Sequence, residues 1–549
     1  MTDSSVFSLI PPFVVLVLGY LTKRIFLSLG VGIFVASLIS QNGNILLALK
    51  KAILIFYGNL ELSSLYSFNF DFWSANNSLI CLFLFTLGIT ITMIHSSGGA
   101  QAYERKVRSI LQTKKQAESA SLILSLFLFI DDYFSSLTVG SVMFSLTDRF
   151  KIPRAKLAFL VDSMAAPLAV ICPISSWVAA IVGFLRDNGI REDAFSPDTK
   201  IIASPFMVYL NIVPYIFYSF LIIFFTWFIV IRRISFGYMK KHEEEAEKTG
   251  NVFYNNPPRQ TYFNKKSGSS ESTMADFLFP IFFLISFIIL GLLVSGQWSG
   301  FAGEVSLWRA LRQSSAPQGL FLGGFLALLI NTCFFCFRGR IRVFQLPQQY
   351  WQGFKMMLPS TLILLLAWTL GDILRNDLHT GKYLGNLFVS TAMHNTLPLM
   401  FFVGSFVASF AIGSSWGTAA MMFPIGVEMY MSISQVTAPI AVEHLPLFYP
   451  ILGAILSGCV AGDHISPISD TTIMTATSTV MVHEEHVQTQ MTYALPIIFS
   501  TGVGYLVCVY TVDLGAWCVF LSLFSSVLFG LTLFHLLNTF AQKGKSNYS

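Results

Sequence analysis

Segments of roughly 17–25 apolar residues follow one another along most of this chain, and each is long enough to cross ~30 Å of hydrocarbon as a helix. Lipid offers no partner to backbone N–H and C=O groups, so such a segment must satisfy them internally, as an α-helix does. Only 11% of the residues are charged, against about 25% in ordinary soluble domains. The sequence therefore predicts an all-α polytopic membrane protein whose main partner is the lipid bilayer.

One polar stretch interrupts an apolar run that extends from about residue 448 to residue 482. Residues 462–472 read GDHISPISDTT and include the carboxylates Asp463 and Asp470. Each charge at membrane depth costs at least ~2.5–3.5 kcal/mol on insertion scales, and Pro467 frees a backbone carbonyl upstream. Such groups must face protein, water or an ion. We predict a discontinuous helix that binds a cation, a proton or an anion; the alternative is a kinked helix whose polar groups satisfy one another.

Residues 118–149 lie between two basic loops, at 105–115 and 149–156. The positive-inside rule places both loops in the cytoplasm. A single helix over this segment would be ~45 Å long, and its middle, at 131–136, is polar. Two short arms that meet at a polar tip fit this pattern better, so we predict a re-entrant hairpin that enters from the cytoplasm.

The order of elements repeats in the two halves of the chain. Each half is expected to contain three spans, a hairpin, a broken span and a closing span, and the hairpin of the second half is expected at 401–428. The sequence PISS at 173–176 is echoed by PISD at 467–470. With the basic loops inside, the halves run in opposite directions, as in the inverted repeats of secondary transporters. We expect about 11 spans plus two hairpins.

The predicted boundaries follow from composition. A long polar stretch divides the halves and has the composition of a flexible cytoplasmic linker. Lys543 and Lys545 favour a cytoplasmic C-terminus. The net charge of +5 is interpreted as a sign of which loops face the cytoplasm, so no nucleic-acid partner is expected. The expected units are a first repeat at 1–231, the linker at 232–275, a second repeat at 276–512, and an extra span with a tail at 513–549.

The polar break has the chemistry of an alkali-cation site. Asp463 and Asp470 supply negative charge for Na⁺, and Ser469, Thr471 and Thr472 supply hydroxyl oxygens beside the carbonyls of a broken helix. Burial favours a protonated carboxyl, whereas a bound cation favours the ionised form. A site of this kind holds Na⁺ or H⁺ but not both, and that competition is a sufficient basis for cation–proton exchange.

The first half offers two further carboxylate positions. Asp131 and Asp132 are adjacent and point in different directions on a helix, so one is expected to face the cavity while the other caps a helix arm or pairs with a basic residue. Asp162 lies near the start of the first broken span. It is either a buried ion-binding carboxylate or a helix-entry residue near cytoplasmic Lys156.

Small polar residues mark the expected tips and breaks, where they could orient substrate; packing of small residues explains the same pattern. His464 either relays protons or bonds a backbone carbonyl. The run from His483 to His486 is expected in a solvated loop. No phosphate-binding loop or nucleophile–base set is present, so we expect neither an enzyme nor a cofactor. The tip candidates are Ser135, Ser175, Ser176, Ser414, Ser415 and Thr418.

The motif at 462–472, with Thr489-Gln490 and Tyr493-Ala494-Leu495 downstream, resembles the signature of the NhaC-type sodium/proton antiporter family. PISSW at 173–177 and GSSWGT at 413–418 resemble other parts of that family. The resemblance implies a bacterial inner-membrane carrier with inverted repeats and two re-entrant hairpins that moves like an elevator. Relatives of the pattern are associated with Na⁺/H⁺ exchange, and others with organic anions or amino acids.

The sequence thus predicts a secondary antiporter that exchanges Na⁺ for H⁺. Asp463 and Asp470 are the expected carriers, and Asp132 and Ser175 are their expected partners from the other half. The alternative is a Na⁺- or H⁺-coupled carrier of a small organic acid or amino acid, in which half-helix N-termini would hold a carboxylate. The sequence leaves a homodimer open as the assembly.

Overall fold

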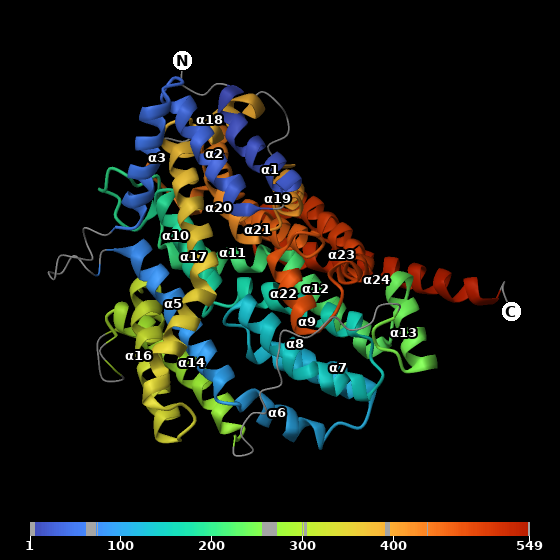
Figure 1. Ribbon diagram of the computed structural model, residues 1–549. Coiled ribbons are helices and arrows are strands. Elements are labelled where there is room, and N and C mark those ends of the chain that lie inside the picture. The colour runs from blue at the N-terminus through green and yellow to red at the C-terminus, as the bar shows by residue number, and fades with distance from the viewer. Residues whose placement is uncertain are drawn as a thin grey trace.

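The chain is almost entirely helical (Figure 1). The computed structural model describes residues 6–22, 24–61, 73, 75–254, 272–298, 300, 305–389, 396–435 and 438–546. Within these ranges, seven helical segments are long and apolar enough to cross a membrane, and a bent pair can add an eighth. This confirms the all-α polytopic fold, while the count of 11 spans stays a prediction.

The first half runs from the N-terminus to the end of α12. Short 3₁₀ segments lie at Val6–Leu9 (η1) and Val213–Tyr215 (η3). Its helices are α1 (Ile10–Thr22), α2 (Ile25–Ser40), α3 (Ile45–Asn59), α5 (Asn76–Ser96), α6 (Gly99–Arg108), α7 (Lys114–Phe127), α8 (Asp132–Arg149), α9 (Arg154–Ile171), α10 (Ser176–Asp187), α11 (Pro205–Ile212) and α12 (Phe217–Arg232).

The second half follows α13 (Gly237–Thr249). Its 3₁₀ segments are η4 (Val343–Gln345), η6 (Val442–His444) and η7 (Val512–Leu514). Its helices are α14 (Ala275–Ser295), α15 (Leu307–Arg312), α16 (Ala316–Phe337), α17 (Leu346–Asn376), α18 (Thr380–Val389), α19 (Leu397–Ile412), α20 (Ser415–Ser434), α21 (Phe448–Asp463), α22 (Asp470–Ser478), α23 (His483–Thr511) and α24 (Ala516–Ser546).

Both predicted hairpins form, as α7–α8 and α19–α20. Their tips are short, at 128–131 and 413–414, and each second arm begins at a side-chain cap. Asp131 accepts a hydrogen bond from the backbone N–H of Phe134 at 2.9 Å, and Ser414 caps α20 in the same way. Such caps satisfy orphan N–H groups where no water reaches.

Both broken helices form as well. α9 and α10 meet at 172–175 with a bend of 47°, and α21 and α22 are separated by 464–469. Ser175 caps α10 and Ser469 caps α22. These two serines hold the same place in the PISS and PISD sequences, so the echo between the halves corresponds to one structural device used twice.

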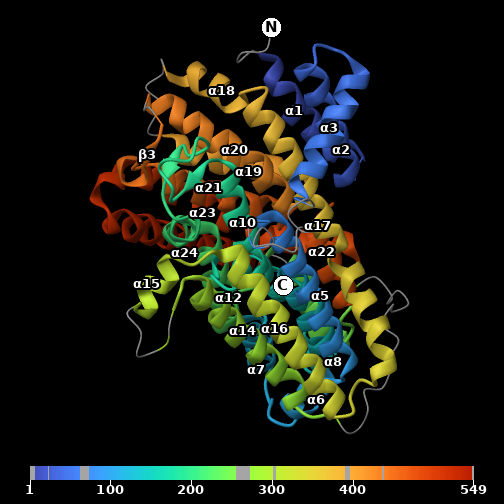
Figure 2. The same cartoon turned by 90° about the vertical axis from the view of Figure 1, so that its left-hand side faces the viewer.

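The halves are interleaved rather than separate. α5 of the first half packs against α16 and α17 of the second, and α17 also packs against α2. These long helices lie to one side of α8, α9, α21 and α22 in Figure 1, and Figure 2 views the molecule from that side. The two breaks therefore lie next to a frame built from both halves.

A small parallel sheet joins loops of the two halves. It has the order β1 (Ile190–Arg191), β2 (Ile201–Ile202) and β3 (Ile440–Ala441). Ile201 is in register with Ile190 on one side and with Ile440 on the other. The loop after the first broken helix is thereby tied to the loop before the second.

Part of the expected flexible linker is a docked helix. α13 buries Met239 and His242 and packs against α9 and α23. Its Glu243 pairs with buried Lys156, Oε1 to Nζ, at 3.0 Å. The expectation of flexibility is therefore wrong for 237–249, because a charged face of the linker finds its counter-charges on the membrane helices. The predicted domain boundaries themselves stay predictions.

Candidate ion-binding site

Asp463 is the last residue of α21 and is only 1% exposed. Its Oδ2 accepts hydrogen bonds from the hydroxyl of Ser415 at 2.8 Å and from the hydroxyl of Thr471 at 3.1 Å. Ser415 begins the second arm of the α19–α20 hairpin, and Thr471 lies in the first turn of α22. The sequence-predicted carboxylate is thus held dry between a hairpin tip and a half-helix.

The start of α22 is organised by its own hydroxyls. Ser469 accepts from the backbone N–H of Thr472 at 3.2 Å, and its hydroxyl lies 3.0 Å from that of Thr471. The N-terminal end of a helix carries a partial positive charge, which stabilises a nearby carboxylate such as Asp463. Asp470 opens this helix; its side chain lies outside the described residues, so its predicted role as an ion ligand stays a prediction.

Asp162 lies in the interior of α9 and is also 1% exposed. Its Oδ2 accepts from the hydroxyl of Thr472 at 3.3 Å and lies 3.2 Å from Nε2 of His486. Its interpretation as a helix-entry residue beside Lys156 is wrong, because Asp162 lies inside α9, eight residues after Arg154, and Lys156 pairs with Glu243 instead. Two adjacent threonines therefore contact two carboxylates, Asp463 from the second half and Asp162 from the first.

The position of His486 contradicts the prediction that the run from His483 to His486 lies in a solvated loop. The run that contains it begins α23 rather than a solvated loop, and its imidazole is fully buried. The amphipathic spacing along α23 explains the difference: Glu484 is exposed while His486, two residues later, faces the bundle. A short charged run at a helix start gives no sign of which of its members turns inward.

Further buried polar groups surround Asp162. Nδ1 of His464 lies 3.0 Å from the hydroxyl of Tyr218, and Nε2 of Gln490 donates to the hydroxyl of Ser163 at 3.4 Å. Tyr218 was not predicted from the sequence, because it sits in a largely apolar run that marks only a membrane span. Gln490 carried a signal only as part of the family resemblance.

The tip of the first hairpin separates the roles of its two aspartates. Asp131 is the helix cap, whereas the carboxylate of Asp132 is buried and accepts from Nε1 of Trp177 at 3.2 Å. The Trp177 ring packs against that of Trp416, with centroids 5.1 Å apart. This pair joins the first broken helix to the tip of the second hairpin.

The predicted tip hydroxyls fall into two groups. Ser175 donates its hydroxyl to the carbonyl of Ala169, in the preceding helix, at 2.7 Å, and its predicted partnership with Asp463 stays a prediction. The hydroxyls of Ser135 and Thr418, together with that of Ser136, which was not predicted, are buried without a hydrogen-bond partner in the described part of the chain. Buried polar groups are rarely left so, so this second group is available to an ion or to water.

Backbone groups of the first hairpin contact both broken helices. The N–H of Ser176 donates to the carbonyl of Ile130 at 2.9 Å, which fixes the first hairpin tip against its own break. The hydroxyl of Ser478, at the end of α22, donates to the carbonyl of Ser136 at 2.7 Å. α22 therefore touches the first half at both of its ends.

Gly413 explains how closely the second tip approaches its break. Its φ is +70°, and a Cβ there would lie 2.6 Å from the carbonyl oxygen of Ile468. Only glycine combines that backbone conformation with that contact. The tip of the α19–α20 hairpin is thus pressed onto the interruption between α21 and α22.

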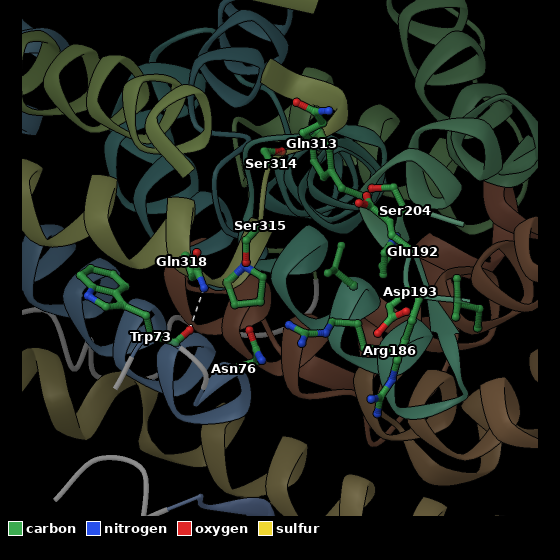
Figure 3. A pocket seen from close by; sticks show the side chains of 17 residues that line it. Trp73, Asn76, Arg186, Glu192, Asp193, Ser204, Gln313, Ser314, Ser315 and Gln318 are labelled. Atoms are coloured by element: carbon green, nitrogen blue, oxygen red, sulfur yellow. Dashed lines mark hydrogen bonds between the residues drawn. The ribbon is translucent and has the colours of Figure 1, made fainter. Parts of the chain in front are cut away.

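A separate cavity of about 390 Å³ lies near the first residues of α5 and the end of α10. Figure 3 shows Arg186 and Asp193 on one side of it and Trp73 and Gln318 on the other. Its described lining contains none of the predicted site residues. The cavity is therefore distinct from the carboxylate site.

Known proteins resemble this chain in sequence and in fold. An uncharacterized protein of Haemophilus influenzae is 31% identical over 519 residues, which cover 93% of this chain and 92% of that protein. The YdaH transporter of Alcanivorax borkumensis shares the fold at a TM-score of 0.53 and 11% identity, over 88% of this chain and 89% of that one. A model of the Na⁺/H⁺ antiporter family matches residues 168–509. The chain therefore belongs to the Na⁺/H⁺ antiporter family and is an ion-coupled, multi-pass membrane transporter.

Proposed function

We propose that this protein exchanges Na⁺ for H⁺ across the bacterial cytoplasmic membrane. One observation carries the proposal: the first turn of α22 contacts a dry carboxylate from each half, Asp463 through Thr471 and Asp162 through Thr472. A single short helix thus links two buried carboxylates that come from different halves of the chain.

Asp463 is the proposed centre of competition. When it is ionised, its carboxylate and the hydroxyls of Ser415 and Thr471 offer hard oxygen ligands to Na⁺. When it is protonated, the charge that balances the cation is gone. Because a dry site tolerates neither an unpaired carboxylate nor an unpaired cation, one occupant must leave as the other binds.

Asp162 and His486 form the second proposed acid–base group. Their ring-nitrogen-to-carboxylate distance of 3.2 Å lets a proton be shared between them. Thr472 links this group to the start of α22. A change of charge at Asp162 therefore changes the electrostatic potential where Na⁺ would bind. A membrane potential then drives any net charge moved, at ~2.3 kcal/mol per charge per 100 mV.

Reconstitution in liposomes with an internal pH dye tests the exchange. Addition of Na⁺ is expected to move protons in wild-type vesicles and to fail in Asp463→Asn and Asp162→Asn vesicles. Glu247→Gln is the matched control, because Glu247 is a largely exposed carboxylate that pairs with Lys114 away from the site. Exchange at wild-type rates in both Asn variants would overturn the proposal.

Asp470→Asn tests the remaining predicted ligand. We expect it to abolish exchange without loss of folding, because Asp470 would add the second negative charge at the start of α22. Wild-type turnover in a folded Asp470→Asn protein would remove that assignment and leave the Asp463–Asp162 pair as the only acidic centre.

A second candidate function is coupled transport of a small organic acid or amino acid. The cavity beside α10 favours it, since about 390 Å³ lies within the range of small-molecule sites and Arg186 and Arg191 line it. In the same vesicles, a dye response that requires an organic anion or an amino acid would select this function. A response to Na⁺ alone selects exchange.

The proposed orientation places the basic ends of α7, α9 and α12 and the C-terminus in the cytoplasm. Reporter fusions after Lys545 and within 192–198 are expected to show opposite sides of the membrane. Reporters on one side would contradict this arrangement.

A further inference from the structure

Two cysteines meet where α23 turns into α24. The Sγ atoms of Cys508 and Cys518 lie 3.4 Å apart, and neither residue is exposed. The short segment η7 and Gly515, with a φ of +58°, reverse the chain between them. The turn thus places two thiols from neighbouring helices in direct contact.

The helices on either side hold this contact in place. α23 and α24 pack closely, and a Cβ at Gly504 would collide with the hydroxyl of Ser526. A disulfide needs its sulfurs ~2.05 Å apart, so the two thiols need a further approach of ~1.4 Å.

The contacts of α23 determine which end of the bundle carries this turn. Tyr493, near its start, donates to the carbonyl of Ile234, directly after basic Arg232 and Arg233. Tyr505, near its end, donates to the carbonyl of Tyr215, at the opposite end of α12. With the basic end in the cytoplasm, the turn lies at the outer face, where envelope conditions permit disulfides.

We propose that Cys508 and Cys518 form a disulfide that fastens α24 to α23. One thiolate attacks a disulfide of an envelope thiol oxidase and forms a mixed disulfide; the second thiolate then displaces the oxidase. The chain loses two protons and two electrons, and the oxidase leaves as a dithiol. Because both sulfurs are buried once folded, the exchange takes place before the turn closes.

The chain contains an internal control at the other face. Cys333 and Cys336 lie near the end of α16, next to Arg338, whose guanidinium pairs with Asp276, Nε to Oδ1, at 2.6 Å. This basic end faces the reducing cytoplasm under the same topology. These two thiols are therefore expected to stay reduced.

The test counts free thiols by mass after alkylation of the denatured protein, purified from cells without added reductant. Wild type is expected to show five alkylated cysteines out of seven, and all seven after reduction. Cys508→Ser is expected to show six with or without reduction. The control Cys333→Ser should show four without reduction and six after it.

Two readouts on the wild type keep the inference testable even if a variant folds poorly. Proteolysis is expected to yield a linked peptide containing Cys508 and Cys518, and the thermal midpoint in detergent is expected to fall when reductant is added. Seven free thiols in unreduced wild-type protein from oxidase-competent cells would overturn the proposal. A linked Cys333–Cys336 peptide instead would overturn the topology on which it rests.

Discussion

The two broken helices share a capping serine and differ in almost everything else. At the first break, Ser175 turns its hydroxyl onto the preceding helix, and the carboxylate Asp162 lies well upstream in α9. At the second, Asp463 ends α21 directly at the interruption, and the hydroxyls of α22 point to carboxylates.

This difference suggests that the repeats contribute different chemistry to one site. The first half supplies a carboxylate and, through Trp177, holds Asp132 in place. The second supplies a carboxylate together with the hydroxyl-rich half-helix that connects the two. The order of hairpin and broken helix, repeated in the two halves, therefore gives the frame, and the differences between the two breaks give the site.

The largest expected effect is loss of exchange on neutralising either carboxylate. Asp463→Asn and Asp162→Asn each weaken two hydrogen bonds to a carboxylate, worth ~1.5–3 kcal/mol each, so Na⁺-driven proton flux in liposomes should fall by at least ~100-fold. If only Asp463→Asn has this effect, the two breaks are not parts of one site.

Removal of the hydroxyl links should have the next largest effect. A hydrogen bond to a charged group is worth ~1.5–3 kcal/mol, so Thr471→Val and Thr472→Val should each raise the KM for Na⁺ by ~10-fold or more. Thr477→Val is the control, since that hydroxyl bonds the carbonyl of Ile473 and the residue is exposed. An unchanged KM for Na⁺ in Thr472→Val would show that the contact between Thr472 and Asp162 does not contribute to binding of the cation.

Substitutions of His486 distinguish two possible roles of its imidazole, which are to share a proton with Asp162 or only to donate a hydrogen bond to it. Gln at this position keeps a hydrogen-bond donor near Asp162 but cannot transfer a proton as an imidazole does, whereas Ala removes both functions. We expect His486→Gln to flatten the pH profile of exchange and to preserve the KM for Na⁺ within ~3-fold of wild type, a difference below ~1 kcal/mol. A wild-type pH profile in His486→Gln would reduce His486 to a positioning residue.

The two capping serines should give the smallest effects and the most direct comparison. Loss of a cap costs about 1 kcal/mol, so Ser175→Ala and Ser469→Ala should lower the thermal midpoint in detergent to a similar extent. Only Ser469→Ala should also raise the KM for Na⁺, because Ser469 contacts Thr471. Equal effects on the KM would mean that the two breaks play the same part.

The sequence was informative where the signal is local. A carboxylate or proline inside an apolar run has few permitted surroundings. The hairpins were therefore predicted from 118–149 and 401–428, the first break from 173–176, and the second break with the burial of Asp463 from 462–472. The positions of Ser175 and Ser469 follow from a four-residue echo because a helix cap is itself a local structure.

The sequence was uninformative where the partner is distant along the chain. His486 meets Asp162 across 324 residues, and Glu243, which lies within the expected linker, meets Lys156 of α9. A charged run is compatible with solvent or with a docked face, and only the counter-charges on other helices decide between them. The choice between Asp162 as helix entry and as buried carboxylate depended on the same missing contacts.

The competition between Na⁺ and H⁺ can be measured directly on purified protein in detergent. Na⁺ is added to a weakly buffered sample, and released protons are followed together with bound ²²Na⁺. The account predicts that wild-type protein releases protons as it binds Na⁺, and that both responses are lost in Asp463→Asn. Undiminished Na⁺ binding in that variant, or binding without proton release in wild type, would contradict it.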